Sequence, residues 1–346
     1  MNRIVSVDTF RVLAIISVIS IHTSPFRECL DTSFCGYLDV LFNQGARFAV
    51  PFFFTISGYF FAEKAKHDRA TIPTMISYIK KLIFIWMFFS AIYIFPYNLL
   101  SILDHGILGP AKVVYWNLLR IAENPVLFLF QGSQAHLWFL VSLSISILIA
   151  SLFIHFFKPK NIIYLVLISL FLYIFGVLSK SYSETPIGIK FNFNTRNGPF
   201  FSTIFFVIGY VLSGYKITNR HIVRGFIIML LGYVISFGEI YYLSSIYGIP
   251  PIEHDYVFGT LFIGLGTSLI ALSNHSILNI KILSKFGKYT LGIYGIHFVF
   301  VSLLSDIDKQ TSNPAWEIGY IFLVFLLSTA TTIKLSNYKK LNKFFV

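Results

Sequence analysis

Long apolar stretches separated by short polar segments make up almost the whole chain. Ten of these stretches, each 17 to 23 residues long, are dominated by Leu, Ile, Val and Phe. They cover residues 7–24, 45–62, 82–102, 137–157, 161–179, 198–214, 225–247, 257–273, 289–305 and 316–333. About 20 apolar residues in a helix cross a bilayer, and a spanning segment must pair its own backbone polar groups. The pattern predicts an all-α protein, a polytopic transmembrane helix bundle of about ten spans, with residues 1–346 forming a single domain.

Two segments need separate interpretation. The region 103–136 contains residues 111–121, which fit an interfacial helix, and residues 125–130, which are too short to span; we expect both to lie outside the membrane or to be re-entrant. The first apolar stretch has the basic start of a signal peptide. It has no small-residue cleavage site after His22 and is followed by more spans, so we expect a retained helix.

Composition and charge support a membrane protein. Of the 346 residues, 56% are hydrophobic and only 12% are charged, whereas soluble proteins carry about 25% charged residues. The net charge of +12 is unevenly distributed. Eighteen Lys and Arg residues fall in segments expected on the same side of the membrane as the N-terminus, and seven fall in segments on the opposite side. This bias predicts that both termini are cytoplasmic and argues against a nucleic-acid partner. The basic C-terminal tail is expected to contact anionic membrane lipid.

The first apolar stretch contains three ionisable side chains, Asp8, Arg11 and His22. Asp8 and Arg11 are one helical turn apart, and Arg11 and His22 share a helix face about 16 Å apart along the axis. Ionisable groups at membrane depth cost about 2.5–3.5 kcal/mol each, so their retention suggests a function. Taken singly, Asp8 and Arg11 also fit an ion pair or helix cap, and His22 fits a buried histidine bonded to a carbonyl. Their shared face favours one cavity lined by both ends of the helix.

Other polar residues are expected at membrane depth. Arg47 and Ser57 lie in the second stretch; Ser57 lacks the sequence context of a catalytic serine, so packing is favoured for it. Histidine is the natural general base near neutral pH, which makes His22 the best candidate for acid–base chemistry. No metal-ligand spacing or nucleotide-binding loop occurs, so we expect no metal. Cys29 and Cys35 could form a disulfide if their loop is extracytoplasmic, or remain two free thiols.

Four sequence blocks occur in order along the chain. They are Arg11 followed after ten residues by His22, then residues 50–59 (VPFFFTISGY), 136–140 (HLWFL) and 287–297 (GKYTLGIYGIH). Together they resemble the acyltransferase-3 family of integral membrane acyltransferases, and the spacing of Arg11 and His22 is similar to the signature of that family's first helix. The arginine–histidine spacing alone is weak, but the ordered set covers nearly the whole chain.

The resemblance implies an acyl-CoA-dependent O-acetyltransferase in the bacterial cytoplasmic (inner) membrane. Acetyl-CoA would be a co-substrate rather than a bound cofactor, and the acceptor would be a hydroxyl of a surface polysaccharide or lipid-linked sugar. We expect His22 to act as the general base and Asp8 to hold Arg11. The expected donor-binding residues are Arg11, Arg47, Lys80 and Lys81. The expected cavity-lining residues are Ser57, Tyr59, Trp138, Arg196, Tyr294 and His297.

One feature departs from the family pattern, and several questions stay open. Members often carry Arg-x-x-Arg where the third helix begins, whereas this chain has the adjacent pair Lys80 and Lys81. Lysine is a point charge rather than a bidentate fork, which weakens the expected role of that motif. A transporter of a small metabolite is the alternative, disfavoured because no inverted repeat is evident. Direct transfer and an acyl-enzyme on His22 or Ser57 both remain open, as do the acceptor sugar and the oligomeric state.

Overall fold

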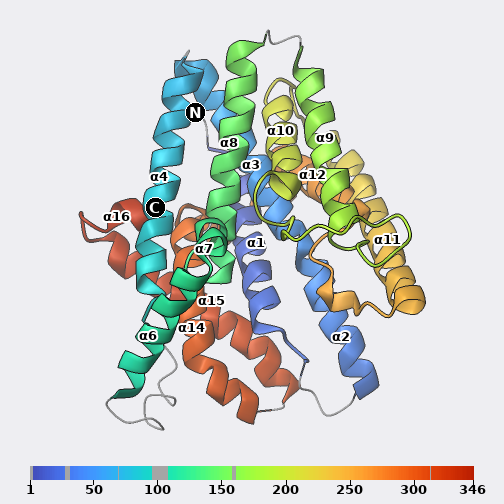
Figure 1. Cartoon of the computed structure of the whole chain (residues 1–346). Helices are drawn as coiled ribbons and strands as arrows, with labels where there is room; N and C mark the ends of the chain where they lie inside the picture. Colours follow the sequence, from blue (N-terminus) through green and yellow to red (C-terminus); the bar gives the residue numbers. More distant parts are fainter. Residues whose placement is uncertain (1–2, 28–31, 69, 96–107, 158–160, 312) are drawn as a thin grey trace.

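The computed structural model describes residues 3–27, 32–68, 70–95, 108–157, 161–311 and 313–346. All regular structure in these segments is helical (Figure 1). The longer helices are α1 (Val5–Thr23), α3 (Ala49–Asp68), α4 (Thr71–Ile92), α8 (Trp138–Phe156), α9 (Ile162–Ser179), α11 (His221–Tyr247), α14 (Thr290–Gln310) and α15 (Pro314–Ser336). The shorter ones are α2 (Thr32–Gly45), α6 (Leu108–Glu123), α7 (Pro125–Gln131), α10 (Pro199–Leu212), α12 (Phe258–Leu272), α13 (Lys281–Ser284) and α16 (Asn342–Phe345). Short 3-10 turns are η1 (Ala46–Phe48), η2 (Ala135–Leu137), η4 (Pro251–Glu253), η5 (Ser276–Leu278) and η6 (Gly287–Tyr289).

Each of the ten predicted stretches coincides with one helix, but not all of these helices qualify as spans. Seven described helical segments are long and apolar enough to cross a membrane, with α8 and α14 counted together with their preceding 3-10 turns. The helices α10 and α12 are apolar but shorter, and α3 ends in several charged residues. The all-helical membrane architecture is therefore confirmed. The number of spans and the side of the membrane on which the termini lie stay predictions.

Several predicted boundaries differ from the structure. Helix α4 begins at Thr71 rather than at residue 82, so Lys80 and Lys81 lie inside it; residues 96–102 of the predicted stretch fall outside the described residues. Helix α2 was not predicted, because its sequence mixes polar and aromatic residues without a long apolar run. The short helices α6 and α7 match the two segments expected between the third and fourth stretches.

Helix α1 lies in the middle of the bundle and packs against α3, α14 and α15 (Figure 1). Its residues Val12, Ala14, Ile15 and Ile19 have no exposed surface. Most of the helix surface is covered by its neighbours, although Leu13 is exposed and the Arg11 side chain is partly accessible. The central position of α1 therefore decides where the site forms.

Helices α3 and α10 cross at very close range. A Cβ atom added to Gly209 would clash with the carbonyl oxygen of Thr55, and one added to Gly58 would clash with the carbonyl oxygen of Phe206. Small residues at such crossings let two backbones approach and gain van der Waals contact, which is the main source of helix association in membranes. This crossing fixes the position of α3, and several other residues of α3, among them Phe53 and Phe60, line an internal cavity that is described below.

A carboxylate in α11 and the C-terminal tail both have partners within the bundle. Glu239 of α11 accepts hydrogen bonds from the hydroxyl of Tyr182 and from the backbone N–H groups of Phe258 and Gly259 at the start of α12. It therefore caps a neighbouring helix. In the C-terminal tail, the ring of Phe344 stacks on Phe88 of α4 with 3.9 Å between centroids, so this segment packs on the bundle.

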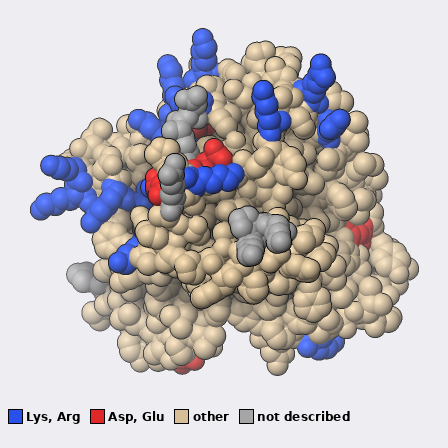
Figure 2. Space-filling view, turned by 90° about the horizontal axis from the view of Figure 1, so that it is seen from above, with Lys and Arg blue, Asp and Glu red and all other residues tan. Residues whose placement is uncertain are grey.

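Lys and Arg side chains gather on the face seen from above in Figure 2, which is the upper end of the bundle in Figure 1. This agrees with the uneven distribution of basic residues along the sequence. The possible disulfide involves Cys29, which lies outside the described residues.

Candidate active site

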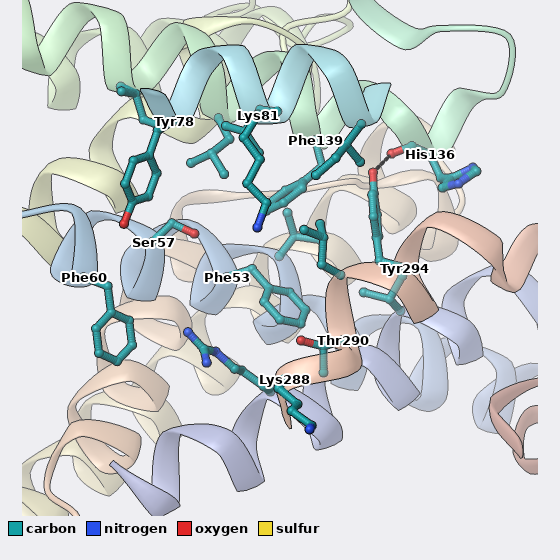
Figure 3. A pocket seen from close by; sticks show the side chains of 18 of the residues that line it. Phe53, Ser57, Phe60, Tyr78, Lys81, His136, Phe139, Lys288, Thr290 and Tyr294 are labelled. Atoms are coloured by element: carbon teal, nitrogen blue, oxygen red, sulfur yellow. Dashed lines mark hydrogen bonds between the residues drawn. The ribbon is translucent and has the colours of Figure 1, made fainter. Parts of the chain in front are cut away.

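A cavity of about 480 Å³ lies among α1, α3, α4, α8 and α14 (Figure 3). Tyr78 and Lys81 extend from α4 across it toward Ser57 and Phe53 of α3. Arg11 and His22 line the same cavity, although eleven residues of α1 separate them. The cavity is therefore long enough to follow α1 over about 16 Å.

The Arg11 end of the cavity is strongly basic. The guanidinium of Arg11 forms an ion pair with Asp8 at 3.0 Å and lies 5.1 Å from the ring centroid of Phe60. Asp8 is also bound by Arg3 at 2.6 Å, so it is fixed between two arginines. Lys64, Lys81 and Lys288 line the cavity as well. An adjoining cavity of about 790 Å³ shares Arg11 and Lys288 and adds Arg3 and Lys285.

Three histidines from three different helical segments meet at the other end. His22 comes from α1, His136 from η2 and His297 from α14. The ring centroids lie 6.2 Å apart for His22 and His136, 5.4 Å for His22 and His297, and 5.0 Å for His136 and His297. His136 and His297 are buried, whereas His22 is partly accessible to the cavity. Among the described residues, no group of three or more His, Cys, Asp or Glu side chains has an arrangement suited to a metal ion.

The hydrogen bond made by His297 defines its tautomer. Its Nδ1 lies 2.7 Å from the carbonyl oxygen of Tyr294, and a carbonyl can only accept. Nδ1 therefore carries the proton, and Nε2 is an unprotonated acceptor. That Nε2 atom is buried and has no hydrogen-bond partner among the described residues. The lone pair of this nitrogen is therefore unused in a ring whose centroid lies 5.4 Å from that of His22.

His136 is held by its backbone and by aromatic contacts. The hydroxyl of Tyr294 donates a short hydrogen bond to the carbonyl oxygen of His136, which Figure 3 shows as a dashed line. The imidazole of His136 stacks on the ring of Phe298, with 5.1 Å between centroids and 5° between planes. This packing keeps the imidazole at the cavity wall.

A group of charged residues beside the histidine end joins three cations to one carboxylate. Asp255 lies 3.2 Å from Arg196, 3.3 Å from Arg47 and 3.5 Å from Lys180. Burial raises the pKa of Asp255, but the three cations more than offset this and lower the pKa to about 2. The guanidinium of Arg196 lies 5.2 Å from the ring centroid of Trp138, which lines the cavity. The group is thus in contact with the cavity wall and keeps a net positive charge.

The structure brings only some of the predicted site residues to the cavity. Those that line it are Arg11, His22, Ser57, Lys81, Trp138 and Tyr294. Those that stand behind the wall or elsewhere are Asp8, Arg47, Tyr59, Lys80, Arg196 and His297. Arg47, predicted to lie with Arg11, is instead bound to Asp255. Phe60, which contacts Arg11, comes thirteen residues after Arg47 in mostly helical chain. At a rise of about 1.5 Å per residue, Arg47 is therefore about 20 Å from the Arg11 end of the cavity.

The cavity also contains residues that the sequence analysis did not select. These are chiefly Lys64, Tyr78, His136 and Lys288. His136 and Lys288 lie inside the sequence blocks quoted above, so the blocks carried a signal for them. Lys64 and Tyr78 had no such signal, because only the packing of α3 against α4 turns them inward.

Apolar helices that enclose an elongated cavity, basic at one end and lined by imidazoles at the other, define a multi-pass membrane protein with an internal reaction or binding chamber. The chain belongs to the acyltransferase-3 family: the family described as an acyltransferase domain matches residues 4–333. The resemblance found in the sequence is therefore confirmed over nearly the whole chain.

The similar curated proteins are longer than this chain. One is an amino-acid racemase of Enterococcus faecalis, 26% identical over 89% of this chain and 42% of its own length. Another is a serine/alanine racemase of Enterococcus gallinarum, 29% identical over 73% of this chain and 35% of its own length. The chain thus spans less than half the length of these relatives. No solved structure matches it.

Proposed function

We propose that this protein transfers an acyl group, most simply acetyl, from acyl-CoA to a hydroxyl of a surface polysaccharide or lipid-linked sugar. Membership of the acyltransferase-3 family supports the reaction class. The observation that carries the proposal is the single cavity that joins the basic Arg11 end to the imidazole of His22. We place the protein in the bacterial cytoplasmic membrane, with the Arg11 end facing the cytoplasm, where acyl-CoA is available.

The charges at the Arg11 end suit the phosphates of the donor. Arg11, Lys64, Lys81 and Lys288 line the cavity there, and of these only Arg11 is paired with a described carboxylate. Lys81 donates a hydrogen bond to the backbone oxygen of Val346 at 3.0 Å, whereas Lys64 and Lys288 lie over the rings of Tyr78 and Tyr289. The ammonium groups of Lys64 and Lys288 are therefore available for phosphate groups. Asp8 orients Arg11 rather than touching the donor. We do not assign Lys80 to the donor-binding residues, because it is exposed and does not line the cavity. We do not assign Arg47 to them either, because it lies beside Asp255.

The middle of the cavity suits the thin arm of the donor. Its wall there includes the apolar side chains of Val18, Phe53 and Leu143. An extended pantetheine arm can cover about 16 Å, the separation of Arg11 and His22 along α1. The thioester of a donor bound by its phosphates would then lie beside the histidines.

His22 is the residue that we assign as general base. Its ring takes the proton of the acceptor hydroxyl while the hydroxyl oxygen bonds to the thioester carbonyl carbon. The carbon–sulfur bond then breaks, and the departing thiolate receives the proton from His22. The products are an O-acyl ester and free CoA. Arg196, close behind Trp138, contributes positive potential toward this end, which favours the negative charge that develops on the carbonyl oxygen.

The test is acyl transfer by the purified protein in lipid nanodiscs, measured with radiolabelled acetyl-CoA and surface polysaccharide. His22→Ala is expected to lower transfer by about 10²- to 10⁴-fold, the range of general acid–base catalysis. His155→Ala is the matched control, because His155 is exposed on α8 and does not line the cavity. Near-normal transfer by a well-folded His22→Ala protein would refute the assignment.

The same preparation separates the remaining alternatives. Direct transfer predicts no labelled protein before acceptor is added, whereas an acyl-enzyme on His22 or Ser57 would add an acetyl group to the intact mass. Glycan-independent uptake of a small metabolite by liposomes, without acetyl release, would favour the transporter. The racemase activity in the relatives' names belongs to proteins more than twice as long as the matched part, and we do not propose it for this chain.

A further inference from the structure

A further polar pocket lies apart from the two cavities described above and shares no lining residue with them. It has a volume of about 540 Å³ and is formed between the segment 179–194 after α9 and the segment 248–254 after α11. These two segments join helices and lie toward one side of the bundle in Figure 1. The lining residues are Ser179, Lys180, Ser181, Ser183, Glu184, Phe191, Asn192, Phe193, Asn194, Gly248, Ile249, Pro250, Glu253 and His254.

The backbone around this pocket is held by buried hydrogen bonds. The hydroxyl of Thr195 donates to the carbonyl oxygen of Gly176 at 2.9 Å, and Tyr256 donates to Thr195 at 2.8 Å. Ser181 donates to the carbonyl oxygen of Tyr256 at 2.7 Å. Thr195, Ser181 and Tyr256 are all buried. The two segments are therefore tied to each other and to α9, so the pocket is formed before any ligand arrives.

Three charged side chains line the pocket, and the only cation among them, Lys180, is already paired; the third, Glu253, adds negative charge, which argues against an anionic ligand. Lys180 is bound to Asp255 at 3.5 Å, and Glu184 is bound to Lys190 at 2.5 Å. The remaining polar groups are mostly neutral: the amide of Asn192, several hydroxyls and the imidazole of His254. His254 is 2% exposed, and its Nε2 has no hydrogen-bond partner among the described residues. Burial and the nearby Arg47 lower the pKa of His254 to about 4, so its imidazole is neutral near pH 7.

Aromatic rings complete the wall. Phe191 and Phe193 lie with 6.2 Å between centroids at an angle of 61°, and Phe191 is 43% exposed. A pocket that combines apolar ring faces with a few fixed donors and acceptors is typical of small-molecule sites. The ligand that matches both features is neutral, has apolar C–H faces and carries many hydroxyl groups that donate and accept.

We propose that this pocket binds a sugar residue of the acceptor glycan. The inference rests on the proposed transfer to a glycan and gives the acceptor a binding place. Lys180, at the pocket wall, contacts Asp255, which is bound to Arg196. Arg196 in turn covers Trp138 at the wall of the cavity that contains His22. A sugar bound here would thus be anchored next to the histidine end, while another residue of the same glycan presents its hydroxyl to His22.

The experiment is saturation-transfer difference NMR on the full chain in nanodiscs, with short oligosaccharides from the surface polysaccharide of the producing organism as the probe. Asn192→Ala and Phe191→Ala are each expected to weaken oligosaccharide binding by about tenfold, the effect of losing one hydrogen bond or one ring face. Ile187→Ala is the matched control, because Ile187 is exposed in the same segment and does not line the pocket.

The outcomes are distinct from those of the acyl-transfer test, because binding needs no turnover. Weaker binding by both pocket variants with normal binding by the control supports the proposal, even if acetyl transfer itself is never detected. Equal binding by all four proteins overturns it. Loss of the sugar signal on adding phosphatidylglycerol vesicles, with no such effect from phosphatidylcholine vesicles, would also overturn it and assign the pocket to a lipid headgroup. In an active preparation, the pocket variants should raise KM for the glycan but not for acetyl-CoA.

Discussion

The imidazole of His297 lies beside that of His22, with 5.4 Å between ring centroids, and its Nε2 can only accept a hydrogen bond. The proton on Nδ1 of His297 is directed to the carbonyl oxygen of Tyr294, so Nε2 remains free. When His22 takes up a proton, both of its ring nitrogens carry an N–H group, and a neighbouring acceptor stabilises this charged form. We interpret His297 as a positioning residue that acts through His22.

Replacing His297 tests this relationship. His297→Phe keeps a ring of similar size but removes the acceptor, and we expect kcat to fall by about tenfold to a hundredfold, less than the loss expected for His22→Ala. KM for acetyl-CoA should not change, because His297 lies away from the basic end. Steady-state kinetics with varied acetyl-CoA measure both constants. A rise in KM with unchanged kcat would contradict the positioning role.

Arg11 is predicted to control donor affinity. It lines the cavity and is fixed by Asp8, so its guanidinium is oriented before the donor binds. A hydrogen bond to a charged group contributes about 1.5–3 kcal/mol, so Arg11→Ala should weaken acetyl-CoA binding by about tenfold to a hundredfold. Isothermal titration calorimetry measures this directly. Arg224→Ala, at an exposed position on α11, should bind normally; equal affinity of both variants would remove Arg11 from the donor site.

Gly209 is predicted to be essential for the α3–α10 crossing. A Cβ atom added to Gly209 would clash with the carbonyl oxygen of Thr55. Because this oxygen belongs to the backbone, no side-chain rotation can relieve the clash. Gly209→Ala should destabilise the protein by about 1–3 kcal/mol, as overpacking does. The readout is the temperature of unfolding in detergent, followed by intrinsic fluorescence. Gly238→Ala on α11, where no heavy atom lies within 4 Å of the added Cβ, should leave that temperature unchanged or raise it.

His254 is predicted to make stability fall as the pH is lowered below neutral. Burial, aided by Arg47, lowers its pKa from 6.5 to about 4. Between these two values the unfolded chain binds a proton that the folded protein does not, so stability decreases as the pH falls from about 6.5 to about 4. Thermal unfolding over this range measures the slope. His254→Gln should reduce the slope, whereas His155→Gln, at an exposed site, should leave it unchanged; equal slopes would contradict the assignment.

The positions of the long apolar helices along the chain could be predicted because a membrane helix must be apolar over most of its length. All ten predicted stretches coincide with helices, and the short segments between the third and fourth also do. The failures have local causes. Helix α2 has too many polar residues to be recognised by hydropathy, and α4 begins eleven residues early because Thr71–Lys81 is helical without being uniformly apolar.

The sequence by itself determined that this protein is a helical membrane bundle of the acyltransferase-3 type, since hydropathy and the order of the motifs follow from the linear order of the residues alone. It also placed Arg11 and His22 on one face, because a single helix fixes their geometry. Only the tertiary structure decided which residues join them. Arg47 meets Asp255 across 208 positions of the chain, and His136 and His297 reach His22 from separate helical segments. Such contacts follow from how the helices pack against each other, and no local pattern encodes that packing.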